Sequence, residues 1–450
     1  MTPSETTELF AHESIKRILF KLAPPVMLAQ TIQAFYSIVD CLFIGRASET
    51  ARTALSIVFP LQLLMLAFAV GAGVGVNTLI AAKLGEGDER AAREYAGVAT
   101  PLALVMWVLF AVATWFFMPQ YAAAQTNTPL VIRDVLIYGR FVCVGSLGIF
   151  LESMWTKILQ AEGNMRLPTV AQILGALVNI ALDPILIFGL LGAPRLGLLG
   201  AAIATVIGQV VAALVVMKGG WRASPARRVY PHAVKNIFRI GAPNILMQAA
   251  YTLYIFGLNM ILATFCDQAV TALGIYYKWQ TLVFIPLGAM QTCIVPVVSF
   301  NYAARSFLRC KQTVRCAVVT GWLLMSLGTL AFIAIPEQLL RVFTNDDLVV
   351  EIGRVEFFFV GLSFFPLVTS LTYPVFFQAV GASMRSAALT ILRTVVLFVP
   401  LAYLFSRFGL NWFWLTFPVT DGITSLVGFG LYRRFFKKDA LAAQQKRLVA

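Results

Sequence analysis

Two acidic residues lie where an aspartate is rarely found, inside long apolar stretches of the sequence. Asp40 interrupts the segment "SIVDCLFIG", and Asp183 interrupts "NIALDPILIFG". On membrane-insertion scales an acid near the middle of a span costs about 2.5–3.5 kcal/mol, so such residues tend to face a protein interior or water and to be functional. The two aspartates are therefore the first candidates for chemistry in this chain.

Polar side chains repeat at helical spacing beside both acids. The two stripes are Gln33, Tyr36 and Asp40, at i, i+3 and i+7, and Gln172, Gly175, Asn179 and Asp183, at i, i+3, i+7 and i+11. Because these positions share one face of a helix, each aspartate ends a polar stripe. The next apolar segment carries a small-residue face, Gly200, Ala204 and Gly208, that allows close helix contact, with Thr205 and Gln209 at its edge.

Carboxylate, amide and hydroxyl oxygens are hard ligands that hold small cations. The set Asp40, Asn179, Asp183 and Thr205 could therefore bind Na⁺, or the two acids could share a proton. A purely structural role is the alternative: each acid could cap a broken helix or accept hydrogen bonds from neighbouring helices, and Asp183 precedes Pro184, which frees a backbone carbonyl. The sequence leaves the choice between Na⁺ and H⁺ open.

The composition is that of a membrane protein. Of 450 residues, 59% are hydrophobic and 12% charged, and the mean hydropathy is +0.80, whereas a soluble chain is about half apolar and a quarter charged. We therefore predict an all-α polytopic membrane protein. Apolar stretches of about 20 residues predict twelve spans: 15–44, 54–81, 95–118, 135–161, 167–190, 197–217, 236–265, 271–300, 314–335, 349–380, 387–405 and 412–432.

Lys and Arg are distributed unevenly between the connections. The two ends of the chain and the even-numbered connections hold twenty-four of them, and the odd-numbered connections hold six. Because basic residues are retained on the cytoplasmic side, both termini are predicted to be cytoplasmic. The net charge of +14 then needs no nucleic-acid partner. Four bases inside or near span ends, Lys157, Lys278, Arg354 and Arg393, are interpreted as snorkelling.

The sequence repeats across its middle. "LAPPVMLAQ" from Leu22 resembles "GAPNILMQA" from Gly241, and "LQAEGNMR" from Leu159 resembles "FQAVGASMR" from Phe377. Two parallel six-span lobes are expected, with a cleft between them for a substrate. The predicted boundaries are 1–218 for the N-lobe, 219–235 for a cytoplasmic linker and 236–450 for the C-lobe.

The repeat also shows where the halves differ. It places Asn259 opposite Asp40 and Val399 opposite Asp183, so both acids belong to the N-terminal half alone. Asp421 stands opposite Thr205 and is a third acid of interest. Aromatic, methionine and polar residues could line a cleft for apolar cations, with ordinary packing as the alternative. The substrate-cleft candidates are Gln33, Tyr36, Gln172, Asn259, Tyr254, Met290 and Asp421.

Five segments, in order along nearly the whole chain, resemble the multidrug and toxic compound extrusion (MATE) family. They are "SIVDCLFIG", "KLGEGDERAA", "LQAEGNMRLPT", "NIALDPILIFG" and "GLLGAAIAT". The resemblance implies twelve helices in two six-helix lobes around a V-shaped cleft. It also implies export of amphipathic, often cationic, compounds coupled to inward Na⁺ or H⁺.

The resemblance further implies an ion site in the N-lobe, made by an acid in the first helix, an Asn and Asp in the fifth and a Thr in the sixth. Those positions are matched by Asp40, Asn179, Asp183 and Thr205. Pro24 and Pro25 are the candidates for a proposed bend of the first helix. Another branch of the family uses an acid in the C-lobe, but this chain has Asn259 in the seventh span, and Glu356 in the tenth matches poorly. The N-lobe site is therefore favoured.

These observations predict an antiporter and not an enzyme. We expect no cofactor besides the coupling ion, drugs or toxic metabolites as substrates, a surrounding lipid bilayer, and a monomer in the bacterial inner membrane. Three alternatives to an antiporter are considered: a lipid-linked precursor flippase of the same architecture, an intramembrane enzyme with Asp40 and Asp183 as an aspartyl pair, and a passive channel or structural membrane protein. The missing glycine-flanked aspartate context argues against the enzyme.

Overall fold

The computed structural model describes the backbone of residues 3–47, 49–126 and 128–449. Within these ranges the side chains of 3–4, 37–42, 44–47, 49, 52, 249, 252–253 and 438–449 lie outside the description. The described residues form helices joined by short connections and contain no strand. By contacts between Cα atoms the chain divides into two units: unit 1 is Met1–Ile245 with Pro296–Phe307, and unit 2 is Leu246–Val295 with Leu308–Ala450.

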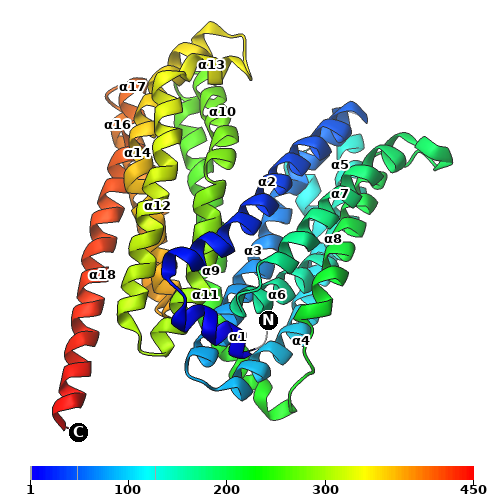
Figure 1. The fold of residues 1–450 in the computed structure, drawn as a ribbon. Coiled ribbons are helices and arrows are strands. Elements are labelled where there is room, and N and C mark those ends of the chain that lie inside the picture. The colour runs from blue at the N-terminus through cyan, green and yellow to red at the C-terminus, as the bar shows by residue number, and fades with distance from the viewer. Residues whose placement is uncertain (1–2, 48, 127, 450) are drawn as a thin grey trace. The chain divides into compact units, whose positions relative to one another are not determined.

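Unit 1 is built from the first eight α-helices and the beginning of the ninth (Figure 1). Their bounds are α1 Pro3–Thr7, α2 Ile15–Ala47, α3 Glu49–Gly85, α4 Glu89–Gln125, α5 Pro129–Val144, α6 Leu147–Ala161, α7 Arg166–Phe188, α8 Leu198–Gly220 and α9 Tyr230–Ala263. Three short non-α helices, η1 Glu8–His12, η2 Leu190–Gly192 and η3 Arg227–Val229, lie between them. The helices α2, α7 and α8, which carry the predicted ion-site residues, pack against one another, and α6 packs against α7 and α8.

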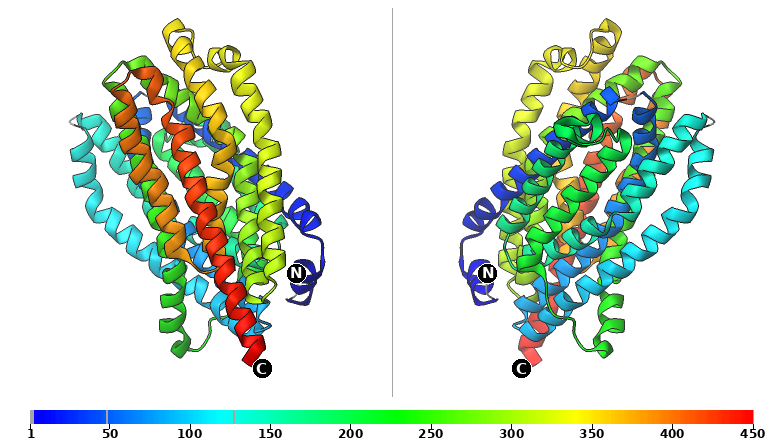
Figure 2. Two further views of the ribbon diagram at one scale, coloured as in Figure 1. Left: turned by 90° about the vertical axis from the view of Figure 1, so that its left-hand side faces the viewer. Right: turned by 90° about the vertical axis from the view of Figure 1, so that its right-hand side faces the viewer.

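Unit 2 holds the end of α9, most of α11 and the remaining helices. Their bounds are α10 Asp267–Val283, α11 Ile285–Ala303, α12 Phe307–Ala334, α13 Pro336–Arg341, α14 Asp347–Ala379, α15 Ser383–Ile391, η4 Leu392–Phe398, α16 Val399–Ser406, α17 Leu410–Phe413 and α18 Thr416–Val449. The long helix α18 runs along α14 (Figure 2). The segment η4 is a π-helix that joins α15 to α16.

Each of the twelve predicted spans falls on one helix or on a run of consecutive helices, so the predicted all-α, twelve-span fold is confirmed. Among the described residues, eight helical segments are long and apolar enough to cross a membrane, and the pair α10–α11, bent by 51°, is a ninth. The other three predicted spans lie on α9, α14 and α18, which contain 34, 33 and 34 residues.

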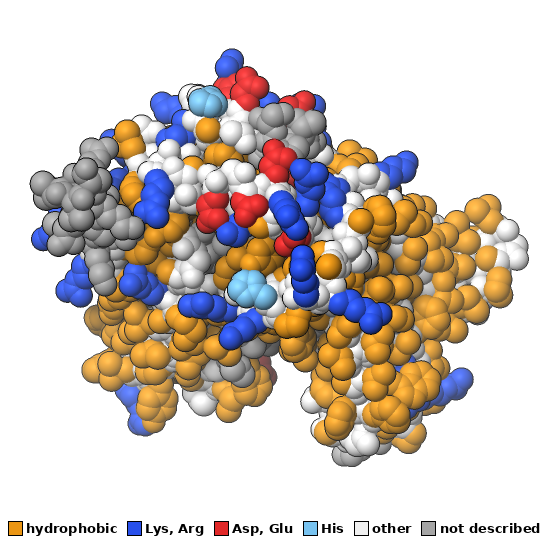
Figure 3. All heavy atoms as spheres, turned by 90° about the horizontal axis from the view of Figure 1, so that it is seen from below, with side chains coloured by type: hydrophobic (Ala, Val, Ile, Leu, Met, Phe, Trp, Pro, Cys, Tyr) orange, Lys and Arg blue, Asp and Glu red, His pale blue; other side chains and the backbone are white. Residues whose placement is uncertain are grey.

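The sequence repeat and the contacts between Cα atoms divide the chain at different residues. The start of α9 and the end of α11 pack with unit 1, although the repeat assigns both helices to the C-terminal half. The lobe boundaries at 218 and 236 therefore stay a prediction about the repeat. Seen from below, the molecule carries Lys and Arg side chains at that end and hydrophobic side chains along its flanks (Figure 3).

Candidate functional site

The helices α7 and α8 touch along their backbones through glycine. A Cβ added to Gly175 would lie 2.7 Å from the carbonyl oxygen of Gly208, and one added to Gly208 would lie 2.7 Å from that of Gly175. Further along the same helices, a Cβ on Gly200 would lie 2.4 Å from the carbonyl oxygen of Leu186. The small-residue face predicted from the sequence is therefore the surface by which α8 packs on α7.

This close approach brings together three of the four predicted ion-site residues. Asn179 lies one turn from Gly175 on α7, and Thr205 lies one turn from Gly208 on α8, so the antiparallel crossing sets them side by side. Both side chains are buried, and Asp183, one turn further along α7, is fully buried. The polar stripe of α7 thus meets the polar edge of α8 at this crossing.

The side-chain amide of Asn179 connects Asp183 with Thr205. In the orientation that satisfies both ends of the amide, its nitrogen donates to Asp183 Oδ2 at 3.1 Å and its oxygen accepts from the backbone N–H of Thr205 at 3.0 Å. In the opposite orientation its nitrogen donates to the Thr205 hydroxyl oxygen at 3.4 Å. Either way, a carboxylate, an amide and a hydroxyl form one buried cluster, and such oxygens fit a small hard cation or a proton.

The fourth residue, Asp40, lies in α2, but its side chain is outside the described residues. α2 packs against α7. Three residues beyond Asp40, Phe43 meets Phe188 of α7 edge to face, with ring centroids 6.3 Å apart. Pro24 and Pro25 lie inside α2, which is assigned as one helix through both prolines.

The remaining stripe residues of unit 1 differ in exposure. Gln33 on α2 is exposed and Tyr36 is half-buried. Gln172, the first residue of the α7 stripe, is half-buried, and its Nε2 donates to Glu152 Oε1 on α6 at 3.5 Å. Glu152 also accepts from the Thr156 hydroxyl at 2.9 Å.

Glu152 is an acid that the sequence interpretation passed over. It carries the same signal as Asp40, because it is a carboxyl inside the predicted span 135–161. It was missed because it follows no stripe along its own helix. Its connection to a polar stripe runs through Gln172 on the neighbouring helix α7.

Three predicted cleft residues are packed inside unit 2. Tyr254, Met290 and Asp421 are all buried. Tyr254 stacks on Phe398 with ring centroids 4.9 Å apart. These positions present little open surface to a substrate.

Asp421 is engaged in a buried ion pair. It accepts from Arg393 Nε at 2.6 Å and Nη2 at 3.4 Å, and from the Ser370 hydroxyl at 2.8 Å. Arg393 is only 6% exposed, so the snorkelling interpretation of this residue is wrong. The reason is that Asp421 supplies a counter-charge inside the unit, and the guanidinium therefore need not reach water.

Two further polar positions of unit 2 stand apart from this pair. Glu356 on α14 is fully buried, and neither carboxylate oxygen has a hydrogen-bond partner among the described residues. Asn259 is half-buried and lines a shallow pocket of about 470 Å³ with Phe256, Met260 and Asp267.

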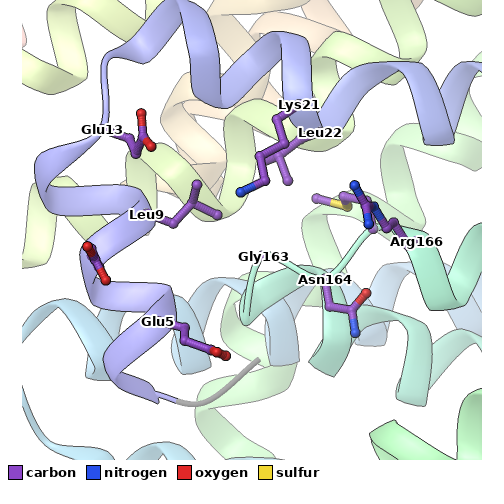
Figure 4. A pocket seen from close by; sticks show the side chains of 10 residues that line it. Glu5, Leu9, Glu13, Lys21, Leu22, Gly163, Asn164 and Arg166 are labelled. Carbon is purple, nitrogen blue, oxygen red and sulfur yellow. The ribbon is translucent and has the colours of Figure 1, made fainter.

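A second hollow lies beside the N-terminal segment, residues 5–13. This pocket, of about 490 Å³, is lined by Glu5, Glu8, Leu9, Glu13, Lys21, Leu22, Gly163, Asn164, Met165 and Arg166. Figure 4 shows acids of the N-terminal segment on one side and Lys21 and Arg166 on the other. Charges of both signs line an open hollow, so no ligand is assigned to it.

The N-terminal segment is fixed to the rest of unit 1 by specific contacts. The Thr6 hydroxyl donates to the carbonyl of Glu162 at 2.9 Å, and Asn301 Nδ2 donates to the carbonyl of Phe10 at 3.2 Å. Glu162 in turn forms an ion pair with Arg222, whose Nη2 donates to both carboxylate oxygens, at 2.8 and 2.9 Å. Burial raises the pKa of the Glu162 carboxyl, and Arg222 opposes that rise.

The comparison with family models decides the identity. The model named MatE matches residues 25–185 and again 243–404. The chain belongs to the MatE family. The two MatE matches begin close to Leu22 and Gly241, the positions at which the sequence comparison detected the repeat.

Curated relatives resemble this chain over nearly its whole length. A "FAD transporter" of Shewanella oneidensis is 26% identical, over 93% of this chain and 95% of the relative. The "Probable multidrug resistance protein YoeA" of Bacillus subtilis is 24% identical, over 97% of each chain. A solved structure, titled as the outward-facing conformation of a multidrug resistance MATE family transporter, shares the fold with a TM-score of 0.90 at 22% identity, covering 96% of this chain and 98% of that one.

Membership of the MatE family settles the class of protein. The chain is a multi-pass membrane protein and a secondary transporter, as predicted, and not an enzyme. Two of its relatives are named as a multidrug resistance protein and a multidrug export protein. This result leaves the ion and the substrate to be derived from the site.

Proposed function

We propose that this MatE transporter exports amphipathic, cationic compounds in exchange for inward movement of H⁺ or Na⁺. The coupling cation binds in unit 1 at Asp40, Asn179, Asp183 and Thr205. The observation that carries the proposal is the buried Asn179–Asp183–Thr205 cluster, held at a helix crossing that only glycine permits. A fully buried aspartate that accepts from a neutral amide is a favourable place for a cation or a proton.

Coupling follows from the helices that carry the ligands. α2 contributes Asp40 and packs on α7, which contributes Asn179 and Asp183. A bound cation reduces the negative charge between α2 and α7. The arrangement of these two helices that is favoured by the charged site is then no longer favoured. Pro24 and Pro25 remove two backbone donors from α2, so this helix is the element that can bend.

Antiport requires that the cation and the substrate favour different conformations. A ligand shifts a conformational equilibrium only by its differential affinity for the two states. The cation favours one conformation by neutralising the aspartates, and the cationic substrate favours the other. The two ligands then compete through a shared equilibrium, which is the reciprocal coupling that linkage requires.

In unit 1 we assign Gln33 and Tyr36, accessible polar residues of α2, to the substrate surface. In unit 2 the accessible polar candidate is Asn259. Phe256 and Met260, which share a pocket with Asn259, add apolar area and a ring face for an amphipathic cation. We propose that the lobes follow the repeat, with residues 219–235 as the linker. We further propose a monomer in the bacterial inner membrane with both termini cytoplasmic, as the distribution of Lys and Arg indicates.

One relative favours a second class of substrate. The FAD transporter of Shewanella oneidensis bears a name that specifies an anionic dinucleotide. An anion of that kind would need basic groups in the substrate site, whereas Arg393 in unit 2 is already paired with Asp421. We therefore rank export of FAD below export of cations and include it in the test.

The deciding experiment is transport by purified protein in liposomes. Na⁺ and pH gradients are imposed separately, and the uphill movement of ethidium and of FAD is measured. We expect ethidium to move against its own gradient under one of the two ion gradients and FAD to remain in place. Movement only down the substrate gradient would indicate a channel, and transport of FAD alone would replace the cationic substrate class.

Transport of a fluorescent lipid-linked pyrophosphate in the same vesicles tests the flippase alternative. We expect none.

A further inference from the structure

Glu152 has an environment that sets it apart from the other acids outside the ion site. It lies in α6, nine residues before the helix ends at Ala161. At 1.5 Å per residue this is about 14 Å from the end of the span. Its Oε1 accepts from Thr156 at 2.9 Å and from Gln172 at 3.5 Å, so one side of the carboxylate is held by two neutral donors.

No basic side chain bonds to this carboxylate among the described residues. Lys157, on the same helix, is the charged group that acts on it electrostatically. The Lys157 ammonium nonetheless donates to Gln160 Oε1, at 2.9 Å. From the packed neighbours, α7 presents the amide of Gln172, and α3 presents Asn77, which donates to the carbonyl of Lys157. A carboxyl held by neutral donors, with no basic side chain bonded to it in the described part of the chain, can take up a proton or bind a mobile cation.

Glu152 and Asp183 are connected through one face of α7, the polar stripe. Gln172, which donates to Glu152, begins the stripe that continues through Asn179 to Asp183. Eleven residues separate Gln172 from Asp183, which corresponds to about 16 Å along the helix axis. Glu152 therefore lies beside the opposite end of the stripe that carries the proposed ion site.

Asp183 and Glu152 lie at different depths in the span, and these depths fit the two ends of an ion route. Asp183 lies five residues before α7 ends at Phe188, and Gln172 lies six residues after α7 begins at Arg166. In the proposed topology the Arg166 end is cytoplasmic. A cation bound at Asp183 must cross most of the span to reach the cytoplasm, and at the inner level α7 itself offers only the neutral amide of Gln172.

We propose that Glu152 is the second cation-binding carboxylate of unit 1, the station through which the coupling H⁺ or Na⁺ passes between Asp183 and the cytoplasm. The proposal rests on the function proposed above and names a residue of its ion route. Thr156 and Gln172 are positioning residues, because they orient the carboxylate toward the α7 stripe. The substrate does not bind at Glu152.

The experiment compares Glu152→Gln with the wild type in liposomes. Two rates are measured: export of ethidium driven by an ion gradient, and exchange of labelled for unlabelled ethidium without any gradient. Exchange needs no release of the cation into the cytoplasm. We expect Glu152→Gln to lose at least tenfold in gradient-driven export while exchange and ethidium affinity stay within about twofold.

A conservative variant and a matched control accompany the test. Glu152→Asp keeps the charge and should restore part of the gradient-driven rate. Asp134→Asn makes the same carboxyl-to-amide change on α5, where Asp134 accepts from the Thr50 hydroxyl at 2.8 Å, and should leave both rates unchanged. If Glu152→Gln fails to fold, Glu152→Asp decides: it should slow gradient-driven export and spare exchange.

Two results would overturn the proposal. Full gradient-driven export in Glu152→Gln would remove this residue from the route, and loss of ethidium binding would make it a substrate residue instead. Failure of the proposed function looks different, since the wild type would then show no gradient-driven export, or Asp183→Asn would retain it.

Discussion

A buried ion pair inside a membrane span constrains two residues at once. Arg393 and Asp421 are 6% and 1% exposed, and their bidentate contact is supported by Ser370. Removing one partner of a buried pair leaves an uncompensated charge, which costs about 3–5 kcal/mol, whereas replacing both by apolar residues is often neutral. The pair therefore has a structural role that single and double substitutions can separate.

We predict that Asp421→Ala lowers the free energy of unfolding of the purified protein by about 3–5 kcal/mol. The double variant Arg393→Met, Asp421→Leu should recover most of that loss. Denaturant unfolding in detergent, followed by fluorescence, measures both. Equal destabilisation by the single and double variants would indicate that the pair contributes to packing through more than its charges.

Asp40 allows a residue-scale test of the proposed ion site. We predict that Asp40→Asn abolishes ion-driven efflux and leaves folding intact, because the amide keeps the size and polarity of the side chain but cannot take a cation or a proton. Efflux is measured in vesicles matched for the amount of protein. Normal efflux at normal expression would remove Asp40 from the mechanism.

At the residue scale the sequence identified individual acids better than their partners. Helical spacing alone placed Asn179 and Asp183 on one face, and both are buried in the same cluster. Helical spacing could not pair Arg393 with Asp421, because the two residues are on different helices. Spacing relates only residues of the same helix. Glu152 was missed for the same reason, since its donor Gln172 is on α7.

The contact between α7 and α8 is an element-scale device that positions the site. The two backbones approach so closely at Gly175 and Gly208 that any side chain there would push the helices apart. Asn179 and Thr205 lie one turn away on either helix, so a change in the crossing moves the donors of the site directly.

We predict that Gly208→Ala reduces ion-driven transport at least tenfold and destabilises the protein by about 1–3 kcal/mol, because the new methyl group would overpack the crossing. Gly274→Ala on α10 is the control, since nothing lies within 4 Å of the Cβ it would add. That control should be neutral or slightly stabilising. Equal transport by both variants, at equal expression, would show that the crossing does not position the ion site.

At the element scale, hydropathy located the spans because a bilayer requires about 20 apolar residues. The small-residue face of α8 was likewise visible as glycine and alanine four residues apart. The packing of the N-terminal segment was not predictable in this way. Its polar, acidic sequence resembles an exposed terminus, and its attachment depends on Asn301, which is 291 residues from Phe10 in the chain.

At the scale of the whole molecule, the repeat and the contacts divide the chain differently. The repeat follows the sequence of spans, whereas the start of α9 and the end of α11 pack with unit 1. A sequence comparison aligns residues along the chain, so it detects the repeat but not where a long helix passes from one unit to the other.

The predicted orientation can be tested on whole cells. In a variant without native cysteines, Leu191→Cys should react with a membrane-impermeant thiol reagent, and Ala226→Cys should react only after the membrane is permeabilised. Both positions are exposed, Leu191 at 91%, so access to the reagent depends on the side of the membrane. The reverse labelling pattern would invert the topology and with it the direction of the proposed ion route.

The central claim is that a cation bound at the buried aspartates of unit 1 drives transport, and Asp183→Asn tests it most directly. The measurement is uphill ethidium export in liposomes under imposed Na⁺ or pH gradients, with ethidium affinity determined on the same protein and Asp134→Asn as the control. The account predicts that Asp183→Asn binds ethidium as the wild type does but exports none against its gradient. Gradient-driven export at the wild-type rate in Asp183→Asn would contradict it.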